Sequence, residues 1–316
     1  MRHLLPILMI VLGAFANAQE ELTLEELLER FSWDFEATEI TTENLGDGLY
    51  VMFGVGGNIA VSVGEQGVLI VDDMFPEMIP KVKAAIAKIQ GGDGDGRIDF
   101  AVNTHWHFDH AEGNLAVGPD GTWIIAHERS AEMMATDNPI NLVITTYRQQ
   151  AYPPDARPAI TYEDSMGFHF NGERIDLIHA GPAHTAGDTA VIFRKHNAVH
   201  FGDVFNNAGY PFIDVDSGGG IDGMIRFCQT ILDEIGPEGV VIPGHGPVTD
   251  AAALQAYIDM LITVRERVAK LMAEGKSLVE VVAARPTADL DATYGPEMQS
   301  LGFVDRVYTS LARDAQ

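Results

Sequence analysis

Short apolar segments with strand-like alternation and stretches with helical spacing follow one another along most of the chain. The first half opens with strands and hairpins, and a helix separates these from two further strands. In chain order we expect strands at 48–54 and 58–73, a helix at 78–89, strands at 98–105 and 122–127, and a helix at 128–136.

The second half repeats this alternation and then becomes helical. Apolar strand-like runs precede positions 184, 203 and 245, and 223–232 has the spacing of an amphipathic helix. Residues 250–275 carry apolar side chains at helical intervals, so a long helix is expected to pack on the core or to form a dimer surface. Further helices are expected at 277–284 and 303–314, and residues 20–31 predict a short amphipathic helix outside the main domain.

The amino terminus has the pattern of an export signal. Arg2 and His3 precede an apolar run that ends at Ala16-Asn17-Ala18. This run is too short for a stable membrane span and carries an A-x-A cleavage pattern, so residues 1–18 are expected to be removed and the mature chain to begin at Gln19. A secreted or periplasmic location follows, and an uncleaved membrane anchor is the alternative.

The strand at 98–105 leads into a run of candidate metal ligands, "NTHWHFDH". Side chains alternate along a strand, so His105 and His107 are expected on one side and Trp106 on the other. If the chain turns there, Asp109 and His110 reach a second ion beside the first. A His-rich surface loop is the alternative, but four good metal ligands within six residues favour a metal site.

Three further candidate ligands each follow an apolar segment. His184 lies in "AHTAGD", Asp203 in "FGD" and His245 in "PGHG". Strand ends followed by Gly, Pro, Asp or Thr are positions where sites on a rigid scaffold collect. Each residue alone could be a turn or capping residue, whereas the ordered set together with residues 105–110 predicts a metal centre.

This series of motifs closely resembles that of the metallo-β-lactamase-fold superfamily, over about residues 45 to 250. The resemblance implies an α/β, four-layer αββα sandwich with the metals along one edge. The expected organisation is a signal peptide at 1–18, an extension at 19–44, the domain at 45–250 and a helical extension packed on it at 251–316.

The resemblance also implies a role for each ligand. His105, His107 and His184 would bind the first ion, Asp109, His110 and His245 the second, and Asp203 both. Two Zn²⁺ ions fit this set, with iron or manganese as alternatives. Asp109 would orient the water between the ions, and Asp72, in "GVLIVDD", would hold a ligand loop from behind. Its alternative is an ordinary turn residue.

The substrate is less well specified than the metals. Asn206, Tyr210 and Phe212 are candidate pocket walls, and the alternative is a surface loop whose aromatic rings lie in the core. Between Asp203 and His245 the only basic residue is Arg226, so the lysine with which Cys-type β-lactamases hold a substrate carboxylate has no counterpart. The other histidines match no ligand motif, and of these His179 and His200 lie nearest to such a motif in sequence.

Composition narrows the function. A net charge of −26 repels phosphate backbones, so a nuclease is disfavoured and no nucleic-acid partner is expected. The single cysteine, Cys228, excludes an intramolecular disulfide and is expected to be a buried thiol. We expect an exported dinuclear zinc hydrolase that opens a small ester, lactone, thioester or cyclic amide, with β-lactams included. The rivals are an iron-dependent sulfur dioxygenase and a non-catalytic metal-binding module, and the oligomeric state stays open.

Overall fold

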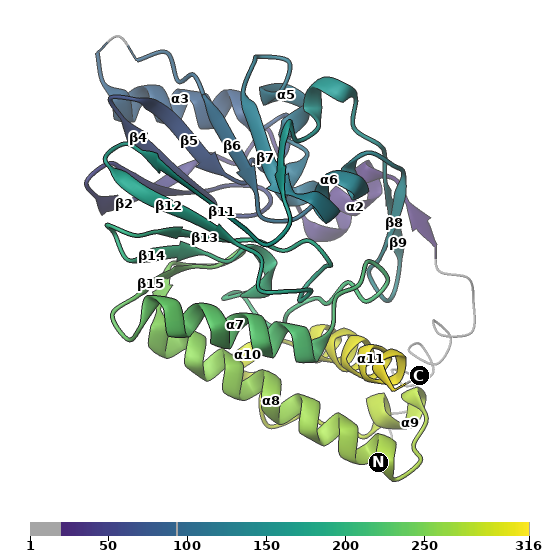
Figure 1. Ribbon diagram of the computed structural model, residues 1–316. Helices are drawn as coiled ribbons and strands as arrows, with labels where there is room; N and C mark the ends of the chain where they lie inside the picture. The colour runs from purple at the N-terminus through teal and green to yellow at the C-terminus, as the bar shows by residue number, and fades with distance from the viewer. Residues whose placement is uncertain (1–19, 93, 316) are drawn as a thin grey trace.

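The computed structural model describes residues 20–92 and 94–315 and shows two facing β-sheets between two layers of helices (Figure 1). The predicted signal peptide lies outside the described residues. The first sheet has the spatial order β10 (Ile160–Tyr162), β7 (Trp123–His127), β6 (Phe100–Asn103), β5 (Gly67–Val71), β4 (Ile59–Gly64), β3 (Leu49–Phe53), β2 (Thr41–Gly46). The second has the order β11 (Ser165–Phe170), β12 (Glu173–Ile178), β13 (Ala190–Phe193), β14 (Ala198–His200), β15 (Val240–Ile242), β16 (Thr249–Asp250).

Helices cover the outer face of each sheet (Figure 1). Around the first sheet lie α2 (Leu24–Phe31), α3 (Ile79–Gln90), α4 (Phe108–Ala111), α5 (Asn114–Val117), α6 (Glu128–Met134) and the 3₁₀ turn η1 (Pro154–Ala156). With the second sheet belong the 3₁₀ turn η2 (Gly202–Val204), α7 (Ile221–Ile235), α8 (Ala251–Ala273), α9 (Leu278–Ala283), α10 (Asp291–Tyr294) and α11 (Glu297–Asp314). The predicted four-layer sandwich is therefore confirmed.

Alternating strand residues divide the apolar interior into three layers, because successive side chains of a strand point to opposite faces. In β13, Val191 and Phe193 lie between the two sheets, whereas Ala190 and Ile192 face the helices of the second half. The strands of the first sheet divide in the same way between the space that separates the sheets and the helices of the first half. Central strands such as β5 and β13 are buried on both faces, which fits their continuous apolar runs.

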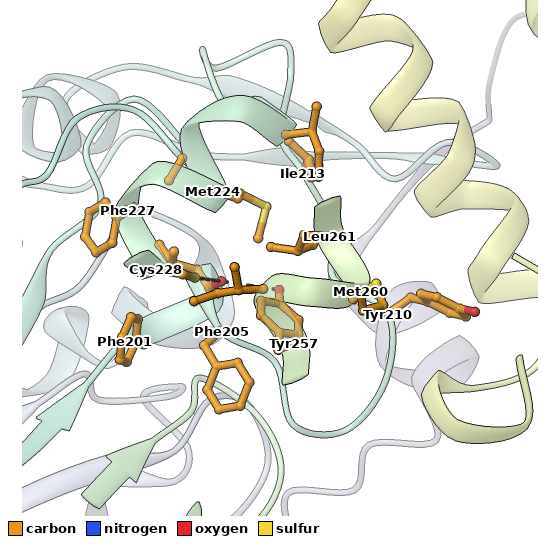
Figure 2. Close-up of a cluster of buried hydrophobic side chains, with 14 of the residues drawn as sticks. Phe201, Phe205, Tyr210, Ile213, Met224, Phe227, Cys228, Tyr257, Met260 and Leu261 are labelled. Atoms are coloured by element: carbon orange, nitrogen blue, oxygen red, sulfur yellow. Dashed lines mark hydrogen bonds between the residues drawn. The ribbon is translucent and has the colours of Figure 1, made fainter. Parts of the chain in front are cut away.

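The outer core of the second half is built by α7 and α8 (Figure 2). Tyr257 and Leu261 of α8 gather there with Met224 and Phe227 of α7, and all four are buried. Cys228 is buried in the same cluster, as predicted, and its Sγ lies 3.6 Å from the carbonyl oxygen of Val204. The helix α8, which corresponds to the long helix expected at 250–275, thus packs on the core. This is one of the two roles expected for it.

The amino-terminal segment packs on the first half of the sandwich, so the expectation of a helix outside the main domain is wrong. α2 begins at Leu24, after the Thr23 capping box, and its Leu27 is fully buried among first-half residues. Ahead of it, β1 (Glu21–Leu22) joins β9 (Thr146–Gln149) and β8 (Asn138–Asn141) in a small third sheet. Among the described residues, no helix has the length and hydropathy needed to cross a membrane.

Candidate metal centre

The predicted ligands come together in the loops that leave one edge of the two sheets. Residues 105–110 follow β6, His184 lies between β12 and β13, Asp203 follows β14 and His245 follows β15. Each of these loops begins at the end of a strand, so the sheet fixes the position of the backbone from which the ligand side chains extend. The structure brings all seven predicted ligands into overlapping groups.

The first motif is not strand, contrary to the sequence-based expectation. β6 ends at Asn103, and His105 lies in the bend that follows. His107 has extended backbone angles and is the residue before α4, whose first turn carries Asp109 and His110. The two histidines still converge, with ring centroids 4.8 Å apart, because the turn, rather than strand alternation, aims them.

One group consists of three histidines. The candidate ligand atoms of His105, His107 and His184 all lie within 4.8 Å of one another. His184 Nε2 is 3.0 Å from His107 Nδ1. All three side chains are almost completely buried.

A second group contains Asp109, His110 and His245. His245 Nε2 lies 3.2 Å from Asp109 Oδ2 and 3.2 Å from His110 Nε2. The side chains of His245 and Asp109 are 23% and 12% exposed, whereas that of His110 is fully buried. A small molecule would therefore approach from the side of this second group.

Asp203 lies between the two groups. Its Oδ1 is 3.0 Å from His110 Nε2 and its Oδ2 is 3.9 Å from His184 Nε2, so one oxygen points to each group. Gly244 makes this possible, because a Cβ there would lie 2.1 Å from Asp203 Oδ1. The glycine before His245 therefore leaves the space that the carboxylate occupies.

Outer hydrogen bonds fix the tautomers of four histidines. His107 Nε2–H donates to Asp214 Oδ2 at 3.0 Å, and His184 Nδ1–H donates to the carbonyl oxygen of Phe212 at 2.8 Å. His110 Nδ1–H donates to Asp72 Oδ2 at 2.7 Å. The Thr104 hydroxyl donates to the same Asp72 oxygen and accepts from His105 Nδ1–H at 3.1 Å. In the neutral form of each ring, the inner nitrogen carries a lone pair.

These lone pairs fit metal ions. Two lone pairs 3.0 Å apart, on His107 and His184, repel unless a cation lies between them. Tetrahedral zinc with Zn–N bonds of about 2.0–2.1 Å separates its nitrogens by about 3.3 Å, close to what is seen here. His105 Nε2 is buried and has no hydrogen-bond partner in the described residues, as expected for a ligand atom. The residues present therefore suit the metals that the motifs predict.

Asp72 lies behind the ligands, where the resemblance predicts it. Its φ of +62° is in the left-handed region, and it is completely buried. Besides His110 and the Thr104 hydroxyl it accepts from the Thr104 backbone N–H, through Oδ1 at 2.7 Å. One carboxylate thus holds His110 and the segment that starts the first motif.

The Asp109 and Asp203 carboxylates create a negative potential at the two histidines of the second group. Burial opposes charge on His110 and His245, but the Asp203 and Asp109 carboxylates outweigh it, so the pKa of His110 is raised well above its usual value and that of His245 to about 10. In the three-histidine group burial dominates, assisted by the neighbouring histidines, and lowers the pKa of His184 to about 4. The second group therefore calls for positive charge, which metal ions would supply.

The predicted pocket residues have different positions. Tyr210 is a correction, because its ring is buried against Phe303 with centroids 5.5 Å apart and its hydroxyl donates to Asp291. Phe212 does lie beside the ligands, 6.1 Å from the His107 ring and 5.8 Å from the His184 ring. Asn206 is partly exposed and uses its side chain in a local turn, accepting from Ala208 N–H.

Sequence reasoning missed Asp214, whose carboxylate orients His107. In "FIDVDSGGG" it resembles its neighbour Asp216, which is exposed, and only the fold shows which of the two turns inward. Asp188 was also missed. It accepts from the Thr185 backbone and hydroxyl and so braces the turn after His184.

Comparisons with known proteins agree with this geometry. The family model of the metallo-beta-lactamase superfamily matches residues 53–270. The 2,4-dinitroanisole O-demethylase subunit alpha of Nocardioides sp. (strain JS1661) is 25% identical over 162 residues, 51% of this chain and 44% of the relative. The chain thus spans less than half the length of that relative.

Solved structures show the same fold at low identity. A metallo-beta-lactamase from Pontibacter korlensis has a TM-score of 0.57 and 16% identity, covering 71% of this chain and 99% of its own. DIM-1 metallo-beta-lactamase has a TM-score of 0.55 and 18% identity, covering 71% of this chain and 98% of its own. At these identities the likeness shows the fold and says nothing about the substrate.

Proposed function

Because the chain belongs to the metallo-beta-lactamase superfamily, we propose that it is a dinuclear zinc hydrolase that opens a small neutral ester, lactone, thioester or cyclic amide. The observation that carries the proposal is the complete ligand set, with Asp203 directing one oxygen to each group. The second group also leaves a substrate a way to the centre, since the side chains of His245 and Asp109 are 23% and 12% exposed, and a non-catalytic metal-binding module would not need such access.

Zinc ions, when bound by these residues, would supply a water of lowered pKa and polarise the substrate carbonyl. Asp109 would accept a hydrogen bond from the attacking water and so direct its lone pair at the carbonyl carbon. Hydrolysis would join the water oxygen to this carbon, break the bond to the leaving oxygen, sulfur or nitrogen, and leave one water proton on the leaving atom. His107 and His184 keep their orientation throughout through Asp214 and the Phe212 carbonyl.

The charge around the centre favours substrates without a carboxylate. The charged groups that most strongly shift the pKa values of Asp203, His110 and His245 are histidines and aspartates. Arg226, the only basic residue between Asp203 and His245, donates to the Pro182 carbonyl oxygen instead. An anionic substrate would thus gain little electrostatic attraction from the residues around the centre. The net charge of the whole chain, −26, also disfavours its approach. The demethylase relative is named for a neutral aryl methyl ether, so that compound belongs in the substrate panel.

The test is a substrate panel with purified, zinc-loaded protein. It contains a neutral phenyl ester, a lactone, a thioester, 2,4-dinitroanisole and a carboxylate-bearing penicillin. We expect turnover of at least one neutral substrate, weaker turnover of the penicillin, and a loss of at least about 100-fold in His107→Ala. His169→Ala, in which an exposed histidine of β11 is removed, is the control and should match the wild type.

Equal turnover by His107→Ala and the wild type would contradict the proposal. Iron in the purified protein together with oxygen consumption on a persulfide would replace it with the sulfur dioxygenase.

We also propose that the protein is exported and acts without a nucleic-acid partner. The support is the amino-terminal sequence pattern and the acidic composition. Amino-terminal sequencing of the mature protein from the secreted or periplasmic fraction is expected to begin at Gln19. A chain that retains Met1 in the membrane fraction would contradict this.

A further inference from the structure

Asn58 connects the first half of the sandwich to the loops that carry two ligands in the second half. It directly precedes β4, and its side chain is 4% exposed. No sequence motif distinguished it. Its hydrogen bonds to Pro243, Gly244, Gly246 and His200 cross from the first half to the second.

The Asn58 amide binds the loop that carries His245. Its Nδ2 group donates to the carbonyl oxygen of Pro243 at 2.9 Å and to that of Gly246 at 2.8 Å. Its backbone N–H donates to the carbonyl oxygen of Gly244 at 2.7 Å. Three hydrogen bonds from one residue therefore bracket His245 on both sides.

The Asn58 carbonyl reaches the loop that carries Asp203. It accepts from His200 Nε2–H at 2.9 Å, and His200 Nδ1 accepts from the backbone N–H of Gly202 at 3.1 Å. His200 is completely buried. Gly202 immediately precedes Asp203, and its carbonyl accepts from Gly244 N–H at 2.8 Å, which links the two loops.

We propose that Asn58 is a positioning residue that holds the Asp203 and His245 loops in register and thereby forms the second metal position. This rests on the proposed two-ion centre. Asn58 contacts backbone around the ligands rather than a ligand side chain or the substrate. The three histidines of the first position, His105, His107 and His184, are held by outer hydrogen bonds to groups other than Asn58, so this position shares only Asp203 with the loops that Asn58 holds.

The chemistry requires an amide at this position. Two carbonyl oxygens face the Nδ2 group, and only a group with two N–H donors binds both. A carboxylate of the same size would place an acceptor against two acceptors. Asn58→Asp therefore removes the interaction without creating a cavity, and Asn58→Ala removes it without adding charge.

The test is stepwise Co²⁺ titration of metal-stripped protein, followed by absorption spectra. For Asn58→Asp and Asn58→Ala we expect the first ion to bind as in the wild type and the second at least about 10-fold more weakly. Asn138→Ala is the matched control, because its Nδ2 also donates to two backbone carbonyls, those of Met133 and Thr136, which belong to the segment between α6 and β8 and not to a ligand loop. It should bind both ions normally.

A second readout needs no metal. Amide hydrogen exchange of residues 244–246 in metal-free protein should be at least about 10-fold faster in Asn58→Ala than in the wild type, and unchanged in Asn138→Ala. Unchanged exchange of this loop in both Asn58 variants would overturn the proposal, whatever the number of ions that the wild type binds. So would equal weakening of both ions, which is the result of a general loss of structure.

Discussion

At the scale of single residues, the centre is determined by hydrogen bonds made on the far side of its ligands. A neutral imidazole offers a metal only the nitrogen that carries no proton, so the acceptor on the other nitrogen selects the ligand atom. Asp214 makes His107 use Nδ1, whereas Asp72 makes His110 use Nε2. These acceptors are as much part of the centre as the histidines.

Removal of the Asp214 acceptor should weaken the first metal position. In Asp214→Ala, the His107 Nε2 proton loses its acceptor and either nitrogen can carry it, so we expect metal affinity to fall by about 10–100-fold. Competition with a chromophoric chelator measures this affinity. Asp216→Ala, two residues away and exposed, should bind as the wild type does, and equal effects of the two variants would show that Asp214 has no special role.

A second residue-scale prediction concerns Gly57. A Cβ at this position would lie 2.2 Å from His110 Cε1, and His110 is held behind by Asp72. Gly57→Ala should therefore displace the ring and reduce turnover by about 100-fold, because a displacement of 1 Å is already costly at a catalytic centre. Gly302→Ala in α11, whose Cβ would have only ordinary contact with Val143, is the control. Normal turnover by Gly57→Ala would contradict the geometry.

At the scale of elements, burial follows the apolar pattern where that pattern is strong. The alternation in 58–73 and the helical spacing in 250–275 predicted β4, β5 and α8. β2 was missed because five of its six residues are polar or glycine, and it is stabilised by its pairing with β3. The amphipathic pattern of residues 20–31 predicted the helix α2 but not the surface on which it packs. An apolar residue such as Leu27 indicates that one face of the helix is buried, without indicating which part of the protein covers it.

The α8 packing leads to a stability prediction. Leu261 is fully buried in the α7–α8 core, whereas the adjacent Ile262 is 36% exposed. Leu261→Ala should reduce the free energy of unfolding by about 2–5 kcal/mol, through lost burial and the cavity left behind. Ile262→Ala should cost less than about 1 kcal/mol. Urea denaturation measures both, and similar losses would mean that α8 does not pack through this face.

At the scale of the whole molecule, a pair of stacked histidines joins the two halves. The rings of His127 and His179 have centroids 3.9 Å apart. His127 Nε2–H donates to the Glu163 carbonyl oxygen and His179 Nδ1–H to that of Asp188. Arg129, Arg226 and the Asp164 carboxylate are the charged groups nearby. Burial lowers both pKa values, that of His127 to about 4 with a contribution from His179.

This pair predicts loss of stability in acid. A folded-state pKa below the unfolded value of about 6.5 means that the neutral ring stabilises the fold above pH 6.5, and that this contribution is lost as the pH falls towards 4. The melting temperature should therefore fall between about pH 7 and about pH 4.5, and fall less in His127→Gln. An identical fall in the two proteins would show that the pair does not contribute.

The whole-molecule arrangement also defines what sequence could reveal about the site. The order and residue types of the ligands predicted a metal centre, because chemistry restricts which side chains bind metals, and the family resemblance predicted how the ligands are grouped. The turn that aims His105 and His107, the inward position of Asp214 and the role of Asn58 depend on backbone paths between distant segments. Tyr210 shows the same difficulty, since an aromatic residue in a loop can face either a pocket or the core.

The central claim is that seven side chains from both halves form one centre for two metal ions. Calorimetric titration of zinc into metal-stripped protein tests it most directly, with Asp203→Ala alongside. The account predicts two zinc ions per wild-type chain and, because Asp203 directs an oxygen to each group, at least about 10-fold weaker binding in Asp203→Ala. A single zinc ion per wild-type chain, bound equally by Asp203→Ala, would contradict it.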